Sequence, residues 1–276
     1  MQDFLRLAAY GAFKGGEKSS DTTFRTVRGT PIMLEICLPA GGLWGISLTG
    51  ALLALKERGL VPNVVTGVSS GAHAAYLVYS GADRQTMVAW FEDARRHMSS
   101  QKVKRFLPPY DSDGLDLQAL IKPYTVQSKI FTQQGISKFF VGYTKLPYFS
   151  FEMEDILSGC HHEGALTILK SSTIPFCTHF GFHIGGAIDG GFRRPLFNAP
   201  ANEPKRRILL SYSGPYGKLL QAFGGPYDDV IQIKPSFARP LNASTVALRK
   251  GLDEGYQQGL TYKLSSKITA ASRKPK

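Results

Sequence analysis

The sequence predicts an α/β protein in which helices cover both faces of a central, largely parallel sheet, a three-layer α/β/α domain. Two observations predict this class. Between residues 34 and 81, short apolar segments alternate with longer helical segments, and glycines stand at the junctions. Further strand-like segments follow at residues 208–212 and 230–233. Strands that alternate with helices form parallel sheets, because each helix carries the chain back across the sheet.

The first two strand-helix units can be placed from local patterns. Residues 34–39 are apolar and predict a strand. Residues 46–58 have leucines at helical spacing and stop at Gly59, so we expect a helix there. The β-branched residues 64–66 lie between Pro-Asn and Gly, which is typical of a short buried strand. Residues 70–80 predict a second helix that again ends at a glycine.

A serine lies at the second strand-to-helix junction. The run from Gly67 to Gly71 is G-V-S-S-G and matches the G-x-S-x-G pattern, in which the flanking glycines allow a sharp turn that pushes one hydroxyl outward. Ser69 is therefore the candidate nucleophile. Its position at a helix N-terminus favours the negative charge that develops during acyl transfer.

A glycine-rich turn lies at the first strand-to-helix junction. Residues 40–45 are A-G-G-L-W-G, and successive glycines let backbone N–H groups converge on an anion. Two interpretations compete, a phosphate cradle of the dinucleotide type and an oxyanion hole. No Gly-Lys-Ser/Thr follows, and the next strand ends in Thr66-Gly67 instead of the acidic residue that would hold a ribose. The sequence therefore favours the oxyanion hole.

The nucleophile needs a base that accepts its proton. α/β-Hydrolases use the chain order Ser, Asp or Glu, His, and no histidine follows His183. A triad that uses His179 or His183 stays open. Asp189 is the other candidate base, because it ends an apolar stretch, is followed by Gly190 and Gly191, and a buried carboxylate can accept a proton directly from a serine.

The three motifs in this order resemble the patatin-like phospholipase family, which has a glycine-rich oxyanion loop, G-x-S-x-G and D-G-G or D-G-A. The resemblance extends over residues 33–264. Residues 166–176 resemble the family's segment of small residues that ends in Ile-Pro. Residues 248–260 are similar to a glycine-tyrosine helix of the adipose triglyceride lipase and adiponutrin branch, which is the closest branch in pattern. The family implies a patatin-like α/β/α fold.

The resemblance also implies a role for each motif residue. Ser69 and Asp189 would form a catalytic dyad. The backbone N–H groups of Gly41, Gly42 and Leu43 would hold the oxyanion. The remaining motif glycines, which would shape the turns, are Gly45, Gly67, Gly71, Gly190 and Gly191. This chemistry requires no metal ion and no cofactor.

Two positions depart from the family pattern. Ala40 replaces the first glycine of the loop, which is harmless only if its φ is negative, because a Cβ atom in the left-handed region costs about 1 kcal/mol or more. Trp44 stands where patatins carry Arg or Lys, although the adipose-lipase branch also has an apolar residue there. Because backbone N–H groups donate to the oxyanion, the chemistry tolerates both changes.

Composition predicts a location and a partner. Three scattered cysteines favour a reducing compartment, and the N-terminus lacks the apolar region of a secretory signal, so we expect a cytoplasmic protein. The net charge is +12, and 13 Lys and Arg face 4 Asp and Glu from Lys205 onward. No nucleic-acid-binding motif accompanies this charge. We therefore expect the basic C-terminal region to contact an anionic membrane or lipid-droplet surface peripherally.

We expect one catalytic domain at residues 31–264, preceded by an N-terminal extension (1–30) and followed by a basic C-terminal tail (265–276). Inside the domain, the patterns predict helices at 85–97 and 115–121, a basic and aromatic loop at 102–110, and strands at 138–143 and 147–151.

The favoured function is a serine lipid acyl hydrolase that acts on a phospholipid or an acylglycerol. Two alternatives stay open. Ala40 and the basic tail are compatible with a catalytically silent lipid-binding or interaction module. His179 or His183 would instead complete a Ser-Asp-His esterase.

Overall fold

The computed structural model describes residues 33–100, 124, 126–175, 177, 183–200 and 205–263. Several predicted features lie outside the described residues: the N-terminal extension, residues 102–110 and 115–121, His179 and the basic tail.

A seven-stranded sheet forms the centre of the described fold, in the order β4-β3-β2-β1-β6-β7, with β5 paired to β3. The parallel strands are β1 (Met33–Leu38), β2 (Val64–Val68), β3 (Lys138–Lys145), β6 (Lys205–Tyr212) and β7 (Asp229–Ile233). The strands β4 (Ser150–Asp155) and β5 (Ala187–Asp189) run antiparallel to β3. The predicted α/β class with a mostly parallel sheet is confirmed.

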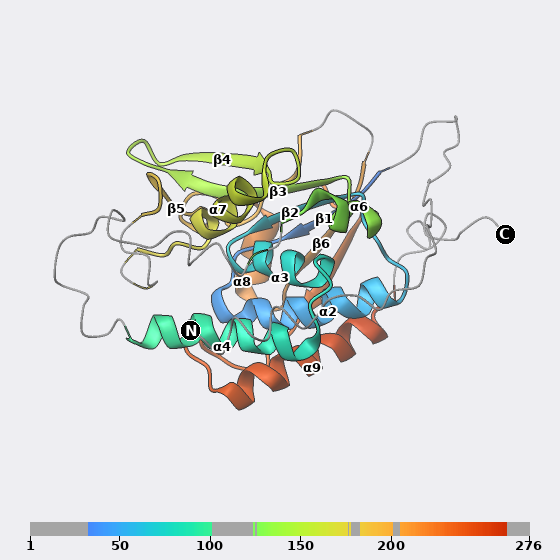
Figure 1. The fold of residues 1–276 in the computed structure, drawn as a ribbon. Helices are drawn as coiled ribbons and strands as arrows, with labels where there is room; N and C mark the ends of the chain where they lie inside the picture. The colour runs from blue at the N-terminus through green and yellow to red at the C-terminus, as the bar shows by residue number, and fades with distance from the viewer. Residues whose placement is uncertain are drawn as a thin grey trace, which may run out of the picture.

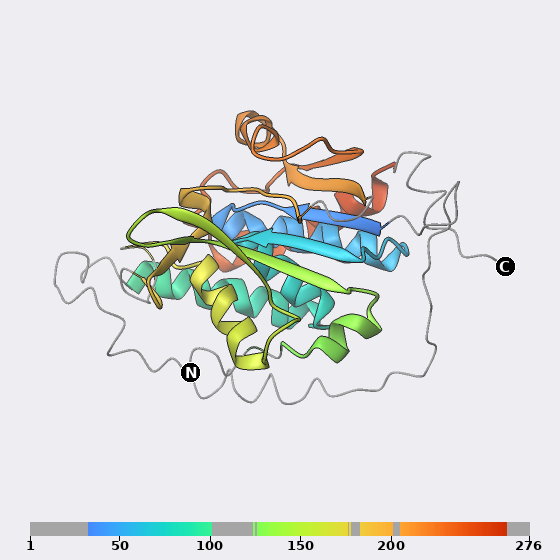
Figure 2. The same ribbon diagram turned by 90° about the horizontal axis from the view of Figure 1, so that it is seen from above.

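Helices flank this sheet (Figures 1 and 2). On the lower side in Figure 1 lie α2 (Gly45–Glu57), α3 (Ser70–Tyr79), α4 (Arg84–Ser100) and α9 (Thr245–Thr261). The shorter helices are α6 (Ser128–Gln133), α7 (His161–Ser171) and α8 (Pro215–Gln221), and two 3-10 turns, η1 (Gly42–Trp44) and η3 (Gly190–Phe192), follow β1 and β5.

Small residues let α9 approach α2 closely. A Cβ atom at Gly255 would lie 2.1 Å from the Ser47 carbonyl oxygen, and one at Gly50 would lie 2.0 Å from the Leu252 carbonyl oxygen. At these two positions the backbone of one helix lies against a glycine of the other helix, where any side chain would collide with it. This contact explains the glycines in the predicted helix at 248–260, and it fixes α2, which begins directly after the glycine-rich turn.

The chain after β5 returns across β1 and β2. Thr66 Oγ1 in β2 donates a hydrogen bond to the Phe197 carbonyl oxygen (3.1 Å), and the Ala199 N–H donates to the carboxylate of Glu35 in β1 (2.6 Å). Glu35 is fully buried and is also paired with Arg207 Nε at 3.1 Å, so its charge is compensated. These contacts tie the segment that follows Asp189 to the strands that precede the glycine-rich turn and Ser69.

The strand predicted at 147–151 is partly wrong. β4 begins only at Ser150, and residues 146–149 form the turn that joins β3 to β4. Phe149 has a φ of 51°, in the left-handed region, which a strand residue does not adopt. The two aromatic residues in this turn, Tyr148 and Phe149, are exposed and not part of the core.

Candidate active site

Ser69 occupies a sharp turn between β2 and α3. Its φ of 53° and ψ of −123° are rare for a residue with a side chain and cost about 1–3 kcal/mol. The flanking glycines are required by close packing: a Cβ atom at Gly71 would lie 2.5 Å from the Leu38 carbonyl oxygen, and one at Gly67 would lie 2.7 Å from the Ala72 Cα. The G-x-S-x-G segment therefore has the strained geometry of a nucleophile turn.

Ser171 holds this turn in place. The backbone N–H of Ser69 donates to Ser171 Oγ at 2.8 Å, and Ser171 Oγ in turn donates to the Gly142 carbonyl oxygen at 2.6 Å. The hydroxyl thus links the last residue of α7 to β3 and to the nucleophile turn. Sequence reasoning did not single out Ser171, although it lies in the 166–176 segment that carries part of the family resemblance.

Asp189 is the last residue of β5, and its register partner in β3 is Tyr143. Its carboxylate accepts hydrogen bonds from the Gly191 N–H at 2.6 Å and from the Ser69 side chain. Only 4% of the surface of each of Ser69 and Asp189 is exposed. The structure therefore brings together the two side chains that the sequence proposes as nucleophile and base.

Burial raises the pKa of Asp189 to about 6, and the hydrogen bonds from Ser69 and Gly191 oppose this shift. A carboxyl group with this pKa is mostly ionised at pH 7, yet it is much more basic than an exposed aspartate. It can therefore accept a proton from the serine.

The glycine-rich turn lies beside these two residues. A Cβ atom at Gly191 would be 2.9 Å from Asp189 Oδ1 and 3.2 Å from the Ala40 Cβ, so Ala40 and the Asp189 carboxylate both lie close to Gly191. A Cβ atom at Gly45 would be 2.5 Å from the Ser70 Cβ. The turn is thus packed between Ser70, next to the candidate nucleophile, and the loop that carries the candidate base.

The N–H groups of the turn differ in availability. The Leu43 N–H donates to the Pro240 carbonyl oxygen at 2.6 Å, so it is already engaged. Gly41 and Gly42 have no backbone hydrogen-bond acceptor for their N–H groups among the residues that the structure describes. Of the three predicted oxyanion donors, Gly41 and Gly42 are therefore the ones whose N–H groups can donate a hydrogen bond to a ligand.

Neither departure from the family pattern distorts the turn. Among the described non-glycine residues, only Ser69 and Phe149 have positive φ, so Ala40 has none of the strain that the substitution could cause. The indole N–H of Trp44 donates to the Phe237 carbonyl oxygen at 2.8 Å. Its ring packs against Tyr212, with ring centroids 5.6 Å apart.

Two tyrosines support the turn from β6 and α8. The Tyr216 hydroxyl donates to the Ala40 carbonyl oxygen at 2.9 Å. A Cβ atom at Gly41 would lie 2.1 Å from the Tyr212 hydroxyl oxygen, although the φ of Gly41 is −177°, an extended value that any residue adopts. Glycine is therefore needed at position 41 for space.

The described histidines do not complete a triad with Asp189. Among the residues that the structure describes, the Asp189 carboxylate has hydrogen bonds only from Ser69 and Gly191. The His183 Nδ1 accepts from the Gly186 N–H at 3.4 Å. His73 lies on α3 in an aromatic cluster with Trp90, and burial lowers its pKa to about 4.

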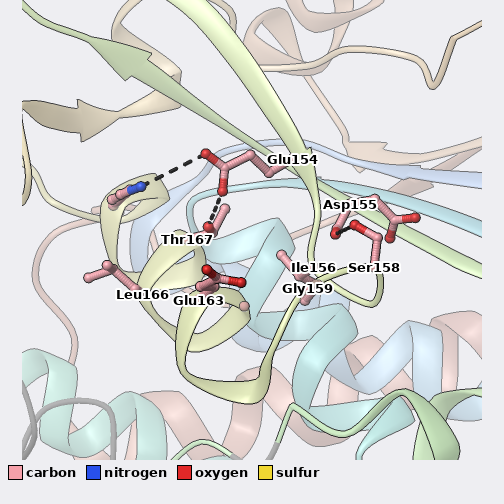
Figure 3. A pocket seen from close by; sticks show the side chains of 10 residues that line it. Glu154, Asp155, Ile156, Ser158, Gly159, Glu163, Leu166 and Thr167 are labelled. Carbon is pink, nitrogen blue, oxygen red and sulfur yellow. Dashed lines mark hydrogen bonds and ion pairs between the residues drawn. The ribbon is translucent and has the colours of Figure 1, made fainter.

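A separate pocket lies between β4 and α7 and has a volume of about 390 Å³ (Figure 3). Neither Ser69 nor Asp189 lines it. Its carboxylates are occupied by the fold: Glu154 accepts from Thr167 and pairs with Lys170 at 3.8 Å, Asp155 accepts from backbone N–H groups, and Glu163 caps α7. The pocket is therefore a structural feature of this edge of the sheet.

Comparison with known proteins agrees with this geometry. Residues 36–200 match the family described as patatin-like phospholipase, which is more than half of the chain, so the chain belongs to the patatin-like phospholipase family. This membership places it generally among the lipid acyl hydrolases. No curated protein matches the chain in sequence.

The chain is similar in structure to VipD from Legionella pneumophila, with 14% identity, a TM-score of 0.52, and coverage of 92% of this chain and 72% of that one. At this identity the likeness bears on the fold alone. A further similar structure is full-length ExoU, solved in complex with SpcU from the type III secretion system of Pseudomonas aeruginosa. It has 15% identity, a TM-score of 0.37, and coverage of 92% of this chain and 61% of that one.

In the part of the chain that the structure describes, no helix combines the length and hydropathy needed to span a bilayer.

Proposed function

We propose that this chain is a serine lipid acyl hydrolase in which Ser69 is the nucleophile, Asp189 is the general base, and the Gly41 and Gly42 N–H groups form the oxyanion hole. The observation that carries the proposal is the hydrogen bond between a serine on a strained turn and a buried aspartate of raised pKa, beside a turn with available N–H groups. The proposed substrate is a phospholipid or an acylglycerol.

The proposed reaction has two steps. Ser69 Oγ attacks the ester carbonyl carbon while its proton passes to Asp189, and the carbonyl oxygen becomes an oxyanion that accepts from Gly41 and Gly42. The tetrahedral intermediate then collapses, the C–O bond to the alcohol breaks, and Asp189 returns the proton to the leaving alcohol. Water next loses a proton to Asp189 and attacks the acyl-Ser69 ester. The fatty acid leaves, and the proton returns to Ser69.

The sequence similarity of α9 to the adipose triglyceride lipase and adiponutrin branch supports an acylglycerol as one of the two proposed substrate classes. The alternative of a silent module loses one of its two reasons, because Ala40 has no unfavourable backbone conformation. A cytoplasmic location with peripheral membrane contact stays part of the proposal.

The test compares adjacent serines. Ser69→Ala should lower ester turnover by about 10³-fold or more and abolish labelling by a fluorophosphonate, because the covalent step is lost. Ser70→Ala is the matched control, since it removes a hydroxyl from the next residue and keeps the Cβ that packs on Gly45. Retained turnover in folded Ser69→Ala protein would refute the proposal.

A further inference from the structure

Resting on the proposed function, we propose that a surface around the candidate active site docks on an anionic phospholipid bilayer. We call it the rim surface. It consists of Phe192, Arg193, Leu219, Arg239 and Leu241, which come from three segments of the chain: residues 190–195, helix α8 and residues 237–246.

Each of these three segments is hydrogen-bonded to the glycine-rich turn. The Ala40 N–H donates to the Pro195 carbonyl oxygen at 2.8 Å, and the Ala40 carbonyl oxygen accepts from the Tyr216 hydroxyl at 2.9 Å. The Leu43 N–H donates to the Pro240 carbonyl oxygen at 2.6 Å. The segments are distant in sequence, but they converge on the turn that holds the proposed oxyanion donors. A membrane bound to them would therefore lie next to the site.

Every segment exposes a large apolar side chain. The exposed fraction is 57% for Phe192, 57% for Leu219 and 47% for Leu241. Phe192 is three residues from Asp189, and the Leu241 Cδ2 lies 3.2 Å from the position of a Cβ atom on Gly42. Such side chains gain by entering the boundary between head groups and acyl chains. Phe192 and Leu241 thus lie near the candidate base and one of the proposed oxyanion donors.

The charge of the same segments indicates that the bound lipid is anionic. Residues 190–195, 215–221 and 237–246 contain no Asp or Glu. Their Lys and Arg residues are Arg193, Arg194, Lys218 and Arg239. Positive side chains beside exposed apolar ones match an anionic bilayer, which offers both negative head groups and an apolar interior. A soluble polyanion would match only the charge.

The apolar residues of the β3–β4 turn do not share this character. Tyr148 and Phe149 are exposed, but the hairpin that carries them pairs its charges: Lys145 pairs with Glu152 at 3.3 Å, and Glu154 pairs with Lys170 at 3.8 Å. The hairpin therefore offers no surplus of positive charge to an anionic surface. The rim surface is therefore the better match.

The test is cosedimentation of the 276-residue chain with vesicles of phosphatidylcholine alone and of phosphatidylcholine with phosphatidylserine. Two double variants alter the rim surface in different ways, Phe192→Ser with Leu241→Ser and Arg193→Glu with Arg239→Glu. We expect wild type to prefer the anionic vesicles and each double variant to bind them about tenfold more weakly or worse.

Matched controls lie at the other end of the molecule. Leu260→Ser changes an exposed leucine near the C-terminal end of α9, where Arg58 Nη1 donates to the Gly259 carbonyl oxygen. The helix α2 begins at the glycine-rich turn, and Arg58 directly follows its other end. Because the 13 residues of α2 span about 20 Å, this end of α9 lies far from the turn. Lys129→Glu changes an exposed lysine on α6, which precedes the first residues of β3. Both control variants should bind vesicles like wild type.

Three outcomes would overturn the proposal: no preference of wild type for anionic vesicles, equal losses in rim and control variants, or rim variants that bind like wild type while deletion of residues 265–276 removes binding.

Hydrolysis of a monomeric short-chain ester is measured in parallel. Rim variants should stay within about twofold of wild type in that assay, because they alter docking and leave the chemistry intact. Failure of wild type to cleave the soluble ester would count against the proposed function, whereas the vesicle result decides the rim surface.

Discussion

Replacement of Ser171 by alanine should impair both the stability and the reactivity of the nucleophile turn. The Ser171 hydroxyl accepts from the Ser69 N–H at 2.8 Å and donates to the Gly142 carbonyl oxygen at 2.6 Å, and all three residues are buried. The substitution leaves the Ser69 N–H without that acceptor. A buried unsatisfied donor costs about 1–3 kcal/mol, so we expect the free energy of unfolding to fall by about 2 kcal/mol.

Reactivity should fall as well, because the lost hydrogen bond is one of the contacts that hold Ser69 at its strained φ of 53°. A displacement of the nucleophile by about 1 Å can cost a hundredfold in rate, so the rate of fluorophosphonate labelling should drop ten- to about a hundredfold. Urea unfolding measures the stability, and the labelling rate of folded protein measures the reactivity.

The neighbouring serine provides the control. Ser172 Oγ donates to the Ile168 and Leu169 carbonyl oxygens at 3.2 Å each, within its own helix and away from Ser69. Ser172→Ala should change the free energy of unfolding by about 0.5 kcal/mol or less and leave the labelling rate unchanged. Equal stabilities and labelling rates for the two variants would refute the role assigned to Ser171.

Three further predictions follow from the geometry. The kcat/KM for a soluble ester should rise as the pH increases through about 6, the pKa of Asp189, because only the ionised carboxylate accepts the proton; a profile flat from pH 5 to 8 would contradict this. The pKa of Asp189 is raised above its unfolded value of about 3.9, so ionisation of this carboxyl group lowers the stability of the fold as the pH rises from about 4 to about 6. Asp189→Asn should therefore increase the free energy of unfolding at pH 7 by up to about 3 kcal/mol, measured by urea titration, while it lowers turnover. Gly41→Ala should reduce kcat at least about tenfold, because the new Cβ atom would lie 2.1 Å from the Tyr212 hydroxyl oxygen and displace the turn. Circular dichroism should show little change in secondary structure, and an undiminished kcat would show that the turn does not need this packing.

Local patterns predicted the parts of the fold that depend on neighbours in sequence. The β-branched residues before Gly67 and the alanine-rich run after Ser70 are sufficient to predict β2 and α3, and the glycines between them indicate a sharp turn. The same is true of α2 and of the helix that became α4. These elements obey rules that act within a few residues.

Long-range contacts could not be read from local patterns. Ser69 and Ser171 are 102 positions apart, and no local rule indicates that a hydroxyl at the end of α7 accepts the Ser69 N–H. The Leu43 N–H was expected to face the oxyanion, but the Pro240 carbonyl oxygen engages it. The proximity of Asp189 to Ser69 came from the family resemblance together with the order of motifs, because spacing alone does not bring two distant residues together.

The most direct test of the account is the site and pH dependence of covalent labelling. Peptide mass spectrometry after fluorophosphonate treatment should find the adduct on Ser69, with a rate that rises through pH 6 in wild type and falls by about 10³-fold in Asp189→Asn. An adduct on another residue, or an equal rate in Asp189→Asn, would contradict the assignment of these two residues as nucleophile and base.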